Sequence, residues 1–329
     1  MKNKNIKKII IRLLISFTIL FLLFWGMKDN LWKVKDNILS VNVYVFSLAV
    51  LIYIFISFIG AARFRYFLSA HNINIGFIDL LKNIYIGYLF NLFLLGSTGG
   101  DVVRSYYISK QTHAKTEVVT MVFFDRLIGM TTMMLIAFSS LVFNLNIVRL
   151  RNMFWVVLFM MLGIISFFIV VFKKDAIKNI KLVRFILSKI FFKDKLKEII
   201  NAVYVFRENK RMIFTGILFS LAIQILAIID CYLVGISMKN IDIVHLRYFF
   251  LMMPIIFMGS ALPVSLGGWG VFEWGFVVCF GMLGVKEADA LSIGLMNRFV
   301  LIILGVIGAI IYVLPGTEHY AVSAIEEEL

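Results

Sequence analysis

Two apolar stretches of the sequence each contain a pair of glycines followed by an acidic residue and then an arginine, and the acid and the arginine are separated by the same interval in both. In the first copy, Ser97, Gly99 and Gly100 lead into Asp101, and Arg126 follows further along the chain. Ionised groups in apolar sequence are costly unless they pair or serve a site. The first copy therefore predicts a functional site in an apolar setting.

The second copy repeats this order of residues. Ser265, Gly267 and Gly268 precede Glu273, and the interval from Glu273 to Arg298 equals the interval between the acid and the arginine of the first copy. Each glycine pair is expected to break a helix, and the helix that begins after the break presents free amides and the positive end of its dipole. Arg126 and Arg298, expected near the starts of the helices that follow each hairpin, add full positive charges, so each copy is expected to bind an anion such as the phosphate of a headgroup.

The two acids have two possible roles, which the sequence leaves open. Asp101 is expected at the N-cap of its helix and Glu273 near the third helical position, so either carboxylate can cap its own helix. Alternatively, each acid pairs with the arginine of its own copy, which lowers the cost of burying both charges. Substrate phosphate would then compete with the acid for the guanidinium group.

Three further ionisable residues belong to the predicted site. Arg104 follows the first motif closely, and Asp125 precedes Arg126 directly. Adjacent residues do not share a helix face, so Asp125 is expected to meet a different partner from Arg126. Asp230 is alone in a long apolar run and is a candidate for proton or cation coupling. The predicted substrate-binding residues are Ser97, Gly99, Gly100, Asp101, Arg104, Arg126, Ser265, Gly267, Gly268, Glu273 and Arg298, and the predicted coupling residues are Asp125 and Asp230.

The composition places the chain in a membrane. Of 329 residues, 61% are hydrophobic and 16% are charged, and the mean hydropathy of +0.95 is incompatible with a water-soluble domain. We predict one integral membrane domain over residues 1–329. The net charge of +14 comes from residues that flank the apolar runs, so anionic lipid at the cytoplasmic face is an expected partner and nucleic acid is not.

Neither a cofactor nor a metal ion is expected. The four histidines are scattered without metal-ligand spacing, and the two cysteines, Cys231 and Cys279, lie in apolar runs where a thiol behaves as a small hydrophobe. The sequence contains no glycine-rich nucleotide loop ending in Gly-Lys-Ser or Gly-Lys-Thr. The energy for transport must therefore come from an ion gradient, the membrane potential or the concentration gradient of the substrate itself. We expect a transporter rather than an enzyme.

The charge pattern predicts the topology. Basic residues before Leu13 place the N-terminus in the cytoplasm, and the basic loop 173–211, part of which has the pattern of an amphipathic surface helix, belongs on the same side. Full crossings at every apolar run would put that loop outside. The segment 77–95 is therefore expected to turn back and to form a re-entrant helical hairpin with 101–113.

The second half follows the same plan upside down. We predict an all-α polytopic fold of two inverted repeats, residues 1–148 and 149–317, each with three crossings and one re-entrant hairpin, because an odd number of crossings inverts the second repeat. Both termini are then cytoplasmic. The expected crossings are 9–27, 41–62, 118–144, 153–172, 212–236 and 290–314, and the second hairpin joins 246–262 to 271–284.

At these motifs the sequence resembles the flippase-like transmembrane region of lysylphosphatidylglycerol synthases. The matching pieces are residues 99–104, 124–129 and 263–273 and the pair Asn297-Arg298, and they follow the same order over nearly the whole chain. The resemblance implies a membrane domain that moves a modified phospholipid, or a polyprenyl-linked sugar, between leaflets. Relatives that make lysylphosphatidylglycerol carry a soluble transferase domain after the membrane part. This sequence lacks that domain, so we do not expect lysyl transfer.

Two alternatives to a flippase of the cytoplasmic membrane stay open. An integral-membrane glycosyltransferase or lipid-modifying enzyme that uses a polyprenyl phosphate needs a carboxylate to act as a base or to hold a metal ion, and Glu287 with Asp289 is the only acidic pair of that kind. A non-transporting scaffold for a cell-envelope synthesis complex would instead tolerate changes at the polar residues. Product formation or leaflet exchange would separate the three hypotheses.

Overall fold

Four long helices form the frame of the protein: α3 (Val43–Ser69), α6 (Lys115–Val142), α11 (Lys210–Ser237) and α14 (Glu287–Val313). Each is long and apolar enough to cross a membrane. At 1.5 Å per residue they span about 40 Å, which exceeds the roughly 30 Å of a bilayer's hydrocarbon core. These helices confirm the predicted segments 41–62, 118–144, 212–236 and 290–314 as helices of spanning length.

The computed structural model describes residues 17–22, 24–26, 28–69, 72–94, 99–143, 209–262 and 264–314, and isolated positions between 155 and 166. Most of the predicted crossing 153–172 and of the basic loop 173–211 lies outside the described residues. In the described part the elements are helical, and extended backbone pairs only at one antiparallel bridge between Val41 and Met238.

Four shorter helices form the two predicted pairs: α4 (Phe77–Asn91) with α5 (Gly99–Thr112), and α12 (Leu246–Ala261) with α13 (Val271–Gly281). The helices of each pair pack against each other. A Cβ atom at Gly100 would overlap the carbonyl oxygen of Gly87, so only glycine allows α4 and α5 to approach backbone to backbone. The helix breaks therefore lie where the glycine pairs predicted them.

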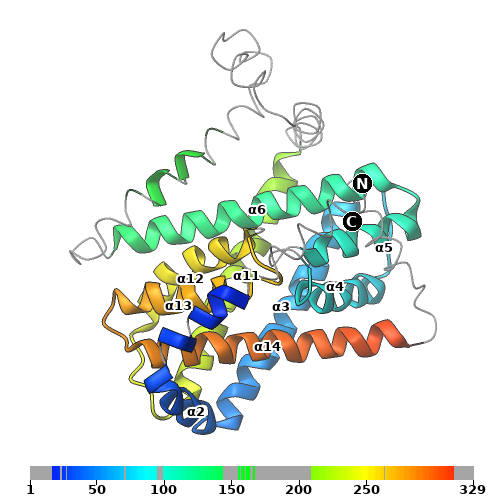
Figure 1. The fold of residues 1–329 in the computed structure, drawn as a ribbon. Helices are drawn as coiled ribbons and strands as arrows, with labels where there is room; N and C mark the ends of the chain where they lie inside the picture. Colours follow the sequence, from blue (N-terminus) through cyan, green and yellow to red (C-terminus); the bar gives the residue numbers. More distant parts are fainter. Residues whose placement is uncertain are drawn as a thin grey trace.

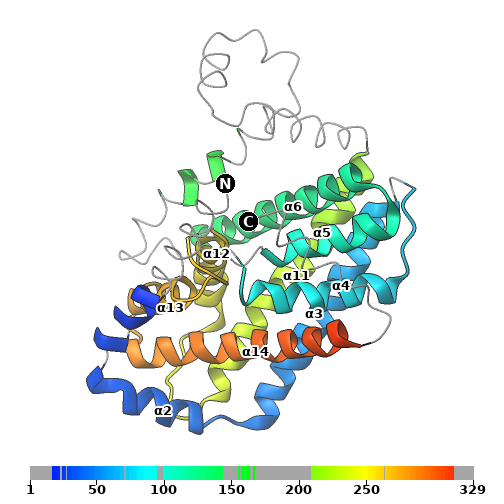
Figure 2. The same cartoon turned by 45° about the vertical axis from the view of Figure 1, so that its right-hand side comes forward.

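The long helices cross one another, and each short helix pair packs on two of them (Figures 1 and 2). The first long helices of the two halves, α3 and α11, run antiparallel, since the amide of Asn42 bonds the carbonyl of Ser237 at 2.7 Å and Arg63 bonds Ser220 towards their other ends. The first short pair packs with α4 on α14 and with α5 on α6. The second short pair packs with α12 on α6 and with α13 on α14.

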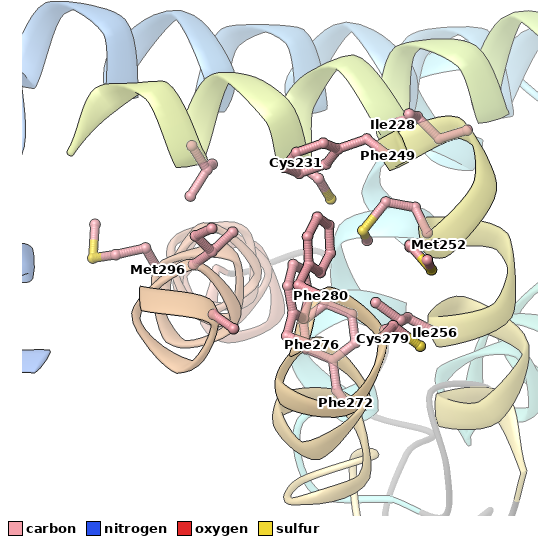
Figure 3. Packing of buried hydrophobic residues seen from close by; sticks show 14 of the residues in the cluster. Ile228, Cys231, Phe249, Met252, Ile256, Phe272, Phe276, Cys279, Phe280 and Met296 are labelled. Carbon is pink, nitrogen blue, oxygen red and sulfur yellow. The ribbon is translucent and has the colours of Figure 1, made fainter. Parts of the chain in front are cut away.

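The main apolar core lies between α11, α12, α13 and α14 (Figure 3). The rings of Phe276 and Phe280 stack with centroids 5.5 Å apart, and Phe249 packs on Phe280 at 4.7 Å, next to Cys231. Lipid tails are as apolar as these side chains, so close packing rather than the hydrophobic effect holds such helices together. Both cysteines are buried in this cluster, as predicted.

A short helix, α2 (Leu31–Leu39), is fixed to the start of α14. Asn37 donates hydrogen bonds to Asp289 at 3.0 Å and to Ser292 at 3.1 Å, and the Lys33 ammonium lies 3.2 Å from the Asp289 carboxylate. Asp289, one half of the acidic pair considered above for an enzyme, therefore serves to hold two helices together.

Candidate functional site

The first motif brings Asp101 and Arg126 into direct contact. Asp101 is the third residue of α5 rather than its N-cap. Its Oδ2 accepts a hydrogen bond from Nε of Arg126, a residue of α6, and Nη2 of the same arginine forms an ion pair with it. The pairing predicted from the spacing is confirmed. The Arg126 side chain remains 38% exposed and the Asp101 side chain 14% exposed, so the pair is only partly buried.

Asp125 faces a second arginine, Arg63 of α3, as expected from its place beside Arg126. The Nε of Arg63 lies 2.7 Å from Oδ1 of Asp125, and its Nη2 donates to Oδ2 at 2.9 Å. Arg104 connects the two ion pairs, because its Nη2 is 3.5 Å from Asp125 and 3.7 Å from Asp101. The result is a continuous charge cluster of three arginines and two aspartates, and it has one surplus positive charge.

Arg104 is the most buried arginine of this cluster. The residue is 8% exposed and its guanidinium group lies 4.4 Å from the centre of the Phe64 ring. Its Nε and Nη2 have no hydrogen-bond partner in the described residues. A buried donor without an acceptor is unfavourable, so an anion that reached Arg104 would satisfy groups that the protein leaves unsatisfied.

The glycines of the first motif serve close packing. A Cβ atom at Gly99 would collide with Leu94, and Gly100 lies against Gly87. The amide of Gly100 donates to Oδ1 of Asn91 at 2.6 Å, so this amide at the start of α5 is already bonded. The expectation of a fully free helix terminus is wrong at this amide, because α4 supplies an amide side chain there. Ser97 lies outside the described residues.

The second motif is closed on itself. The Oε1 of Glu273 accepts a 2.8 Å hydrogen bond from Nε of Arg298, while its Oε2 accepts a 2.7 Å bond from the amide of Gly270. Glu273 thus both caps α13 and pairs with Arg298, so the two roles left open by the sequence are both filled. Arg298 also donates from Nη1 to the carbonyl of Gly267 at 2.8 Å and from Nη2 to that of Gly268 at 3.1 Å.

Burial separates the second motif from the first. Glu273 is 0% exposed and Arg298 is 4% exposed, and the rings of Trp269 and Phe272 each lie 4.8 Å from the guanidinium carbon. The loop that supplies these contacts needs glycine at three positions with positive φ, namely Gly267 at 56°, Gly268 at 70° and Gly270 at 82°. Ser265 is fully buried, and its hydroxyl has no partner in the described residues.

The two helix breaks meet. The amide of Gly267 donates to the carbonyl of Leu94 at 2.6 Å, and the indole Nε1 of Trp269 donates to the carbonyl of Leu92 at 3.2 Å. These bonds satisfy carbonyls at the C-terminal end of α4 that lack helical partners. The motifs, far apart in sequence, therefore share one location in the interior.

Three residues of this arrangement were not predicted from the sequence, and one predicted residue, Asp230, takes no part in its ion pairs. Arg63, Asn91 and Trp269 were not predicted as site residues, although the arginine directly after an apolar run was a signal that α3 extends beyond residue 62. Asp230, the predicted coupling residue, is 1% exposed within α11 and forms no ion pair with any residue that the structure describes.

The fold and the site define a helical integral membrane protein with a buried charge cluster beside paired helix breaks. The family model described as the lysylphosphatidylglycerol synthase TM region matches residues 9–309, so the chain belongs to this family. A UPF0104 membrane protein of Pyrococcus horikoshii is 25% identical over 284 residues, which cover 77% of this chain and 81% of the relative.

Proposed function

We propose that the protein moves lipids with a phosphodiester headgroup between the leaflets of the cytoplasmic membrane. One observation carries the proposal: the cluster of Arg63, Arg104, Arg126, Asp101 and Asp125 has one surplus positive charge, and Arg126 remains 38% exposed. An uncompensated charge is unfavourable in a medium of low dielectric constant. A single phosphodiester group carries one negative charge and would neutralise the cluster.

Phospholipids and polyprenyl phosphosugars share this phosphodiester chemistry, and both fit the proposal. The headgroup would contact Arg126 and the unsatisfied donors of Arg104, while Asp101 gives up part of its hold on Arg126. The acyl or prenyl tails would stay in the bilayer. The family description supports a lipid cargo, because it names the membrane region of an enzyme that modifies a phospholipid.

The arrangement of helices supports alternating exposure of the site. We propose that residues 1–148 and 149–317 form inverted repeats with re-entrant pairs α4–α5 and α12–α13. The antiparallel course of α3 and α11 and the exchanged packing of the short pairs on α14 and α6 agree with such a plan. Rocking of one half against the other would expose the cluster to each side in turn. Both termini and the basic loop 173–211 would lie in the cytoplasm.

A transferase is not favoured by any observation at the acidic pair. Asp289 is engaged by Lys33 and Asn37, which hold α2 on α14. Among the described residues no group of three His, Cys, Asp or Glu side chains is placed to hold a metal ion. A scaffold without transport remains an outcome of the experiment below.

The test is leaflet exchange in reconstituted vesicles. Purified protein is incorporated into vesicles with a trace of headgroup-labelled phosphatidylglycerol in one arm and a labelled polyprenyl phosphosugar in the other. Label that becomes accessible to an impermeant quencher reports exchange, and the arm that responds identifies the lipid. Arg126→Gln removes the charge and keeps much of the stem, and Arg65→Gln on the exposed face of α3 is the matched control.

We expect exchange in at least one arm by the natural sequence and by Arg65→Gln, and a loss of at least about tenfold in Arg126→Gln, which corresponds to about 1.4 kcal/mol of lost headgroup interaction. Equal exchange in Arg126→Gln would disprove the role of the cluster. An absence of exchange in both arms by folded protein would favour a scaffold.

A further inference from the structure

Asp230 is a carboxyl group buried in a membrane-spanning helix without a cation beside it. It is 1% exposed, and its Oδ1 has no hydrogen-bond partner in the described residues. The other buried acids near the helix breaks, Asp125 and Glu273, each bind an arginine. An ionised carboxylate without such a partner is costly inside a membrane, so burial works in favour of the neutral, protonated acid, and nearby positive charge works against it.

The position of Asp230 in α11 matches that of Arg63 in α3. Asp230 is as far from the first residue of α11, Lys210, as Arg63 is from the first residue of α3, Val43. The first half therefore has a cation where the second half has an acid. Arg63 is committed to Asp125, whereas Asp230 has no such commitment in the described residues.

Three side chains with hydroxyl groups, Tyr53, Ser57 and Tyr88, lie together where α3 packs against α4. Tyr53 of α3 interacts electrostatically with both Asp230 and Arg126. Its ring packs edge-on against Tyr88 of α4 with centroids 5.9 Å apart, and the Tyr88 hydroxyl lies 3.2 Å from that of Ser57. Tyr88 in turn interacts with Arg126. Asp230 and Arg126 therefore both lie within electrostatic range of one buried tyrosine, Tyr53.

In the described residues, the helices that pack on α11 form no ion pair with Asp230. Helix α3 contributes Tyr53, and α6 contributes Arg126, which acts on the same tyrosine. Within α11 the neighbouring titratable group is Cys231, and on α14 the charge of Arg298 is engaged by Glu273. The core around Cys231 is otherwise apolar (Figure 3), with Phe249 and Met252 from α12 and Met296 and Val300 from α14.

We propose that Asp230 is a proton-binding site whose occupancy is coupled to headgroup binding at the charge cluster. This inference rests on the proposed function. The step is the binding of one proton from water to a carboxylate oxygen of Asp230, which converts the carboxylate to a neutral acid, and no other bond forms or breaks.

The sign of the coupling follows from the charges. The surplus positive charge of the empty cluster favours the ionised form of Asp230, and a bound phosphodiester cancels that charge, so headgroup binding favours proton uptake. Because linkage is reciprocal, protonation of Asp230 strengthens headgroup binding by the same factor. Anion and proton would then travel together, and the occupied interior would carry no added net charge.

Titration calorimetry tests the coupling directly. Detergent-solubilised full-length protein is titrated with short-chain phosphatidylglycerol in two buffers with different ionisation enthalpies, since the difference in observed heat gives the number of protons taken up per lipid bound. Asp230→Asn keeps the shape of the side chain and mimics the neutral acid. Asp242→Asn, at an exposed position after α11, is the matched control.

We expect the natural sequence and Asp242→Asn to take up a fraction of a proton per lipid bound and to bind more tightly as the pH falls, by at most about tenfold per pH unit for one linked proton. Asp230→Asn is expected to bind the lipid as tightly as the natural sequence does at low pH, without proton uptake and without pH dependence. Tyr53→Phe is expected to retain binding and to show a reduced proton uptake.

The outcomes separate the two proposals. Lipid binding by the natural sequence without proton uptake, or unchanged proton uptake in Asp230→Asn, would overturn the coupling and leave the proposed function standing. If phosphatidylglycerol does not bind, the same titration with a short-chain polyprenyl phosphosugar replaces it. Failure of both lipids to bind to folded protein would overturn the headgroup site and the coupling together.

Discussion

The two acid-arginine pairs have the same spacing and opposite surroundings. Arg298 is 4% exposed and donates from all three nitrogens, to Glu273 and to two glycine carbonyls. Arg126 has an exposed fraction of 38% and is held by Asp101. A repeated motif therefore does not imply a repeated role: one copy is buried and closed, a structural lock, and the other is partly exposed and is the site proposed above.

The neighbouring residues explain this difference. Asn297 occupies the place of Asp125, and its amide bonds the carbonyl of Ile293 within the same helix, so the second motif carries no further charge. Trp269 and Phe272 cover Arg298. The first motif has Arg104 in addition, with donors left unsatisfied. Of the two described motifs, the surplus charge therefore belongs to the first, which is why the anion site is proposed there.

The largest predicted effect is on stability, and it tests the lock. Arg298→Ala leaves Glu273 buried without a cation, which is expected to cost about 3–5 kcal/mol. Arg126→Ala removes a partly exposed arginine and leaves Asp101 beside Arg104, at 3.7 Å, so we expect a cost of no more than about 1 kcal/mol. The measurement is the apparent unfolding temperature of detergent-purified protein. Equal destabilisation by the two substitutions would refute the distinction between lock and site.

The second predicted effect concerns the contact that shapes the accessible site. Gly100→Ala places a methyl group against the Gly87 carbonyl and forces α4 and α5 apart, which we expect to cost about 1–3 kcal/mol. Gly129→Ala on α6 is the matched control, because a Cβ atom there meets nothing within 4 Å. If thermal unfolding shows the two alanine variants to be equally stable, the close approach of the helices is not required.

Much of this fold could be predicted from the sequence, since hydrophobic run lengths and glycine pairs locate helices and breaks without tertiary information. The repeated interval also offered the pairing of Asp101 with Arg126 and of Glu273 with Arg298, as one of two roles that the sequence left open, and the structure shows both pairs. The partner of Asp125 did not, because Arg63 lies on a helix far away in sequence and its position depends on how α3 packs against α6.

The difference in burial between the two motifs could not be predicted from the sequence either. It depends on which side chains cover each arginine, and Trp269 reaches Arg298 only because its loop folds back through three glycines with positive φ. Such a loop conformation is allowed by the sequence but not required by it. For the same reason, the amide of Asn91 at the start of α5 could not be anticipated, since it depends on the register between α4 and α5.

A smaller effect is expected at the junction of the two breaks. Trp269→Phe keeps a ring beside Arg298 and removes the indole donor to the Leu92 carbonyl, which is expected to cost about 0.5–1.5 kcal/mol. Trp274→Phe is the control, because Trp274 is 53% exposed. Hydrogen exchange measured by mass spectrometry should show faster exchange at the C-terminal end of α4 in Trp269→Phe alone. No difference between the two variants would mean that the breaks are held together by other contacts.

The smallest effect on stability should accompany a clear effect on binding. Asp101→Asn weakens an ion pair whose arginine is 38% exposed, so we expect a loss of less than about 1 kcal/mol in stability. The same change raises the surplus charge of the cluster and frees Arg126 from its competitor, which should tighten the binding of short-chain phosphatidylglycerol severalfold and slow its release. Glu273→Gln should do the reverse, because it unpairs a buried arginine: a large loss of stability with no gain in affinity. Weaker lipid binding by a stably folded Asp101→Asn would show that Asp101 helps to hold the headgroup rather than competing with it for Arg126.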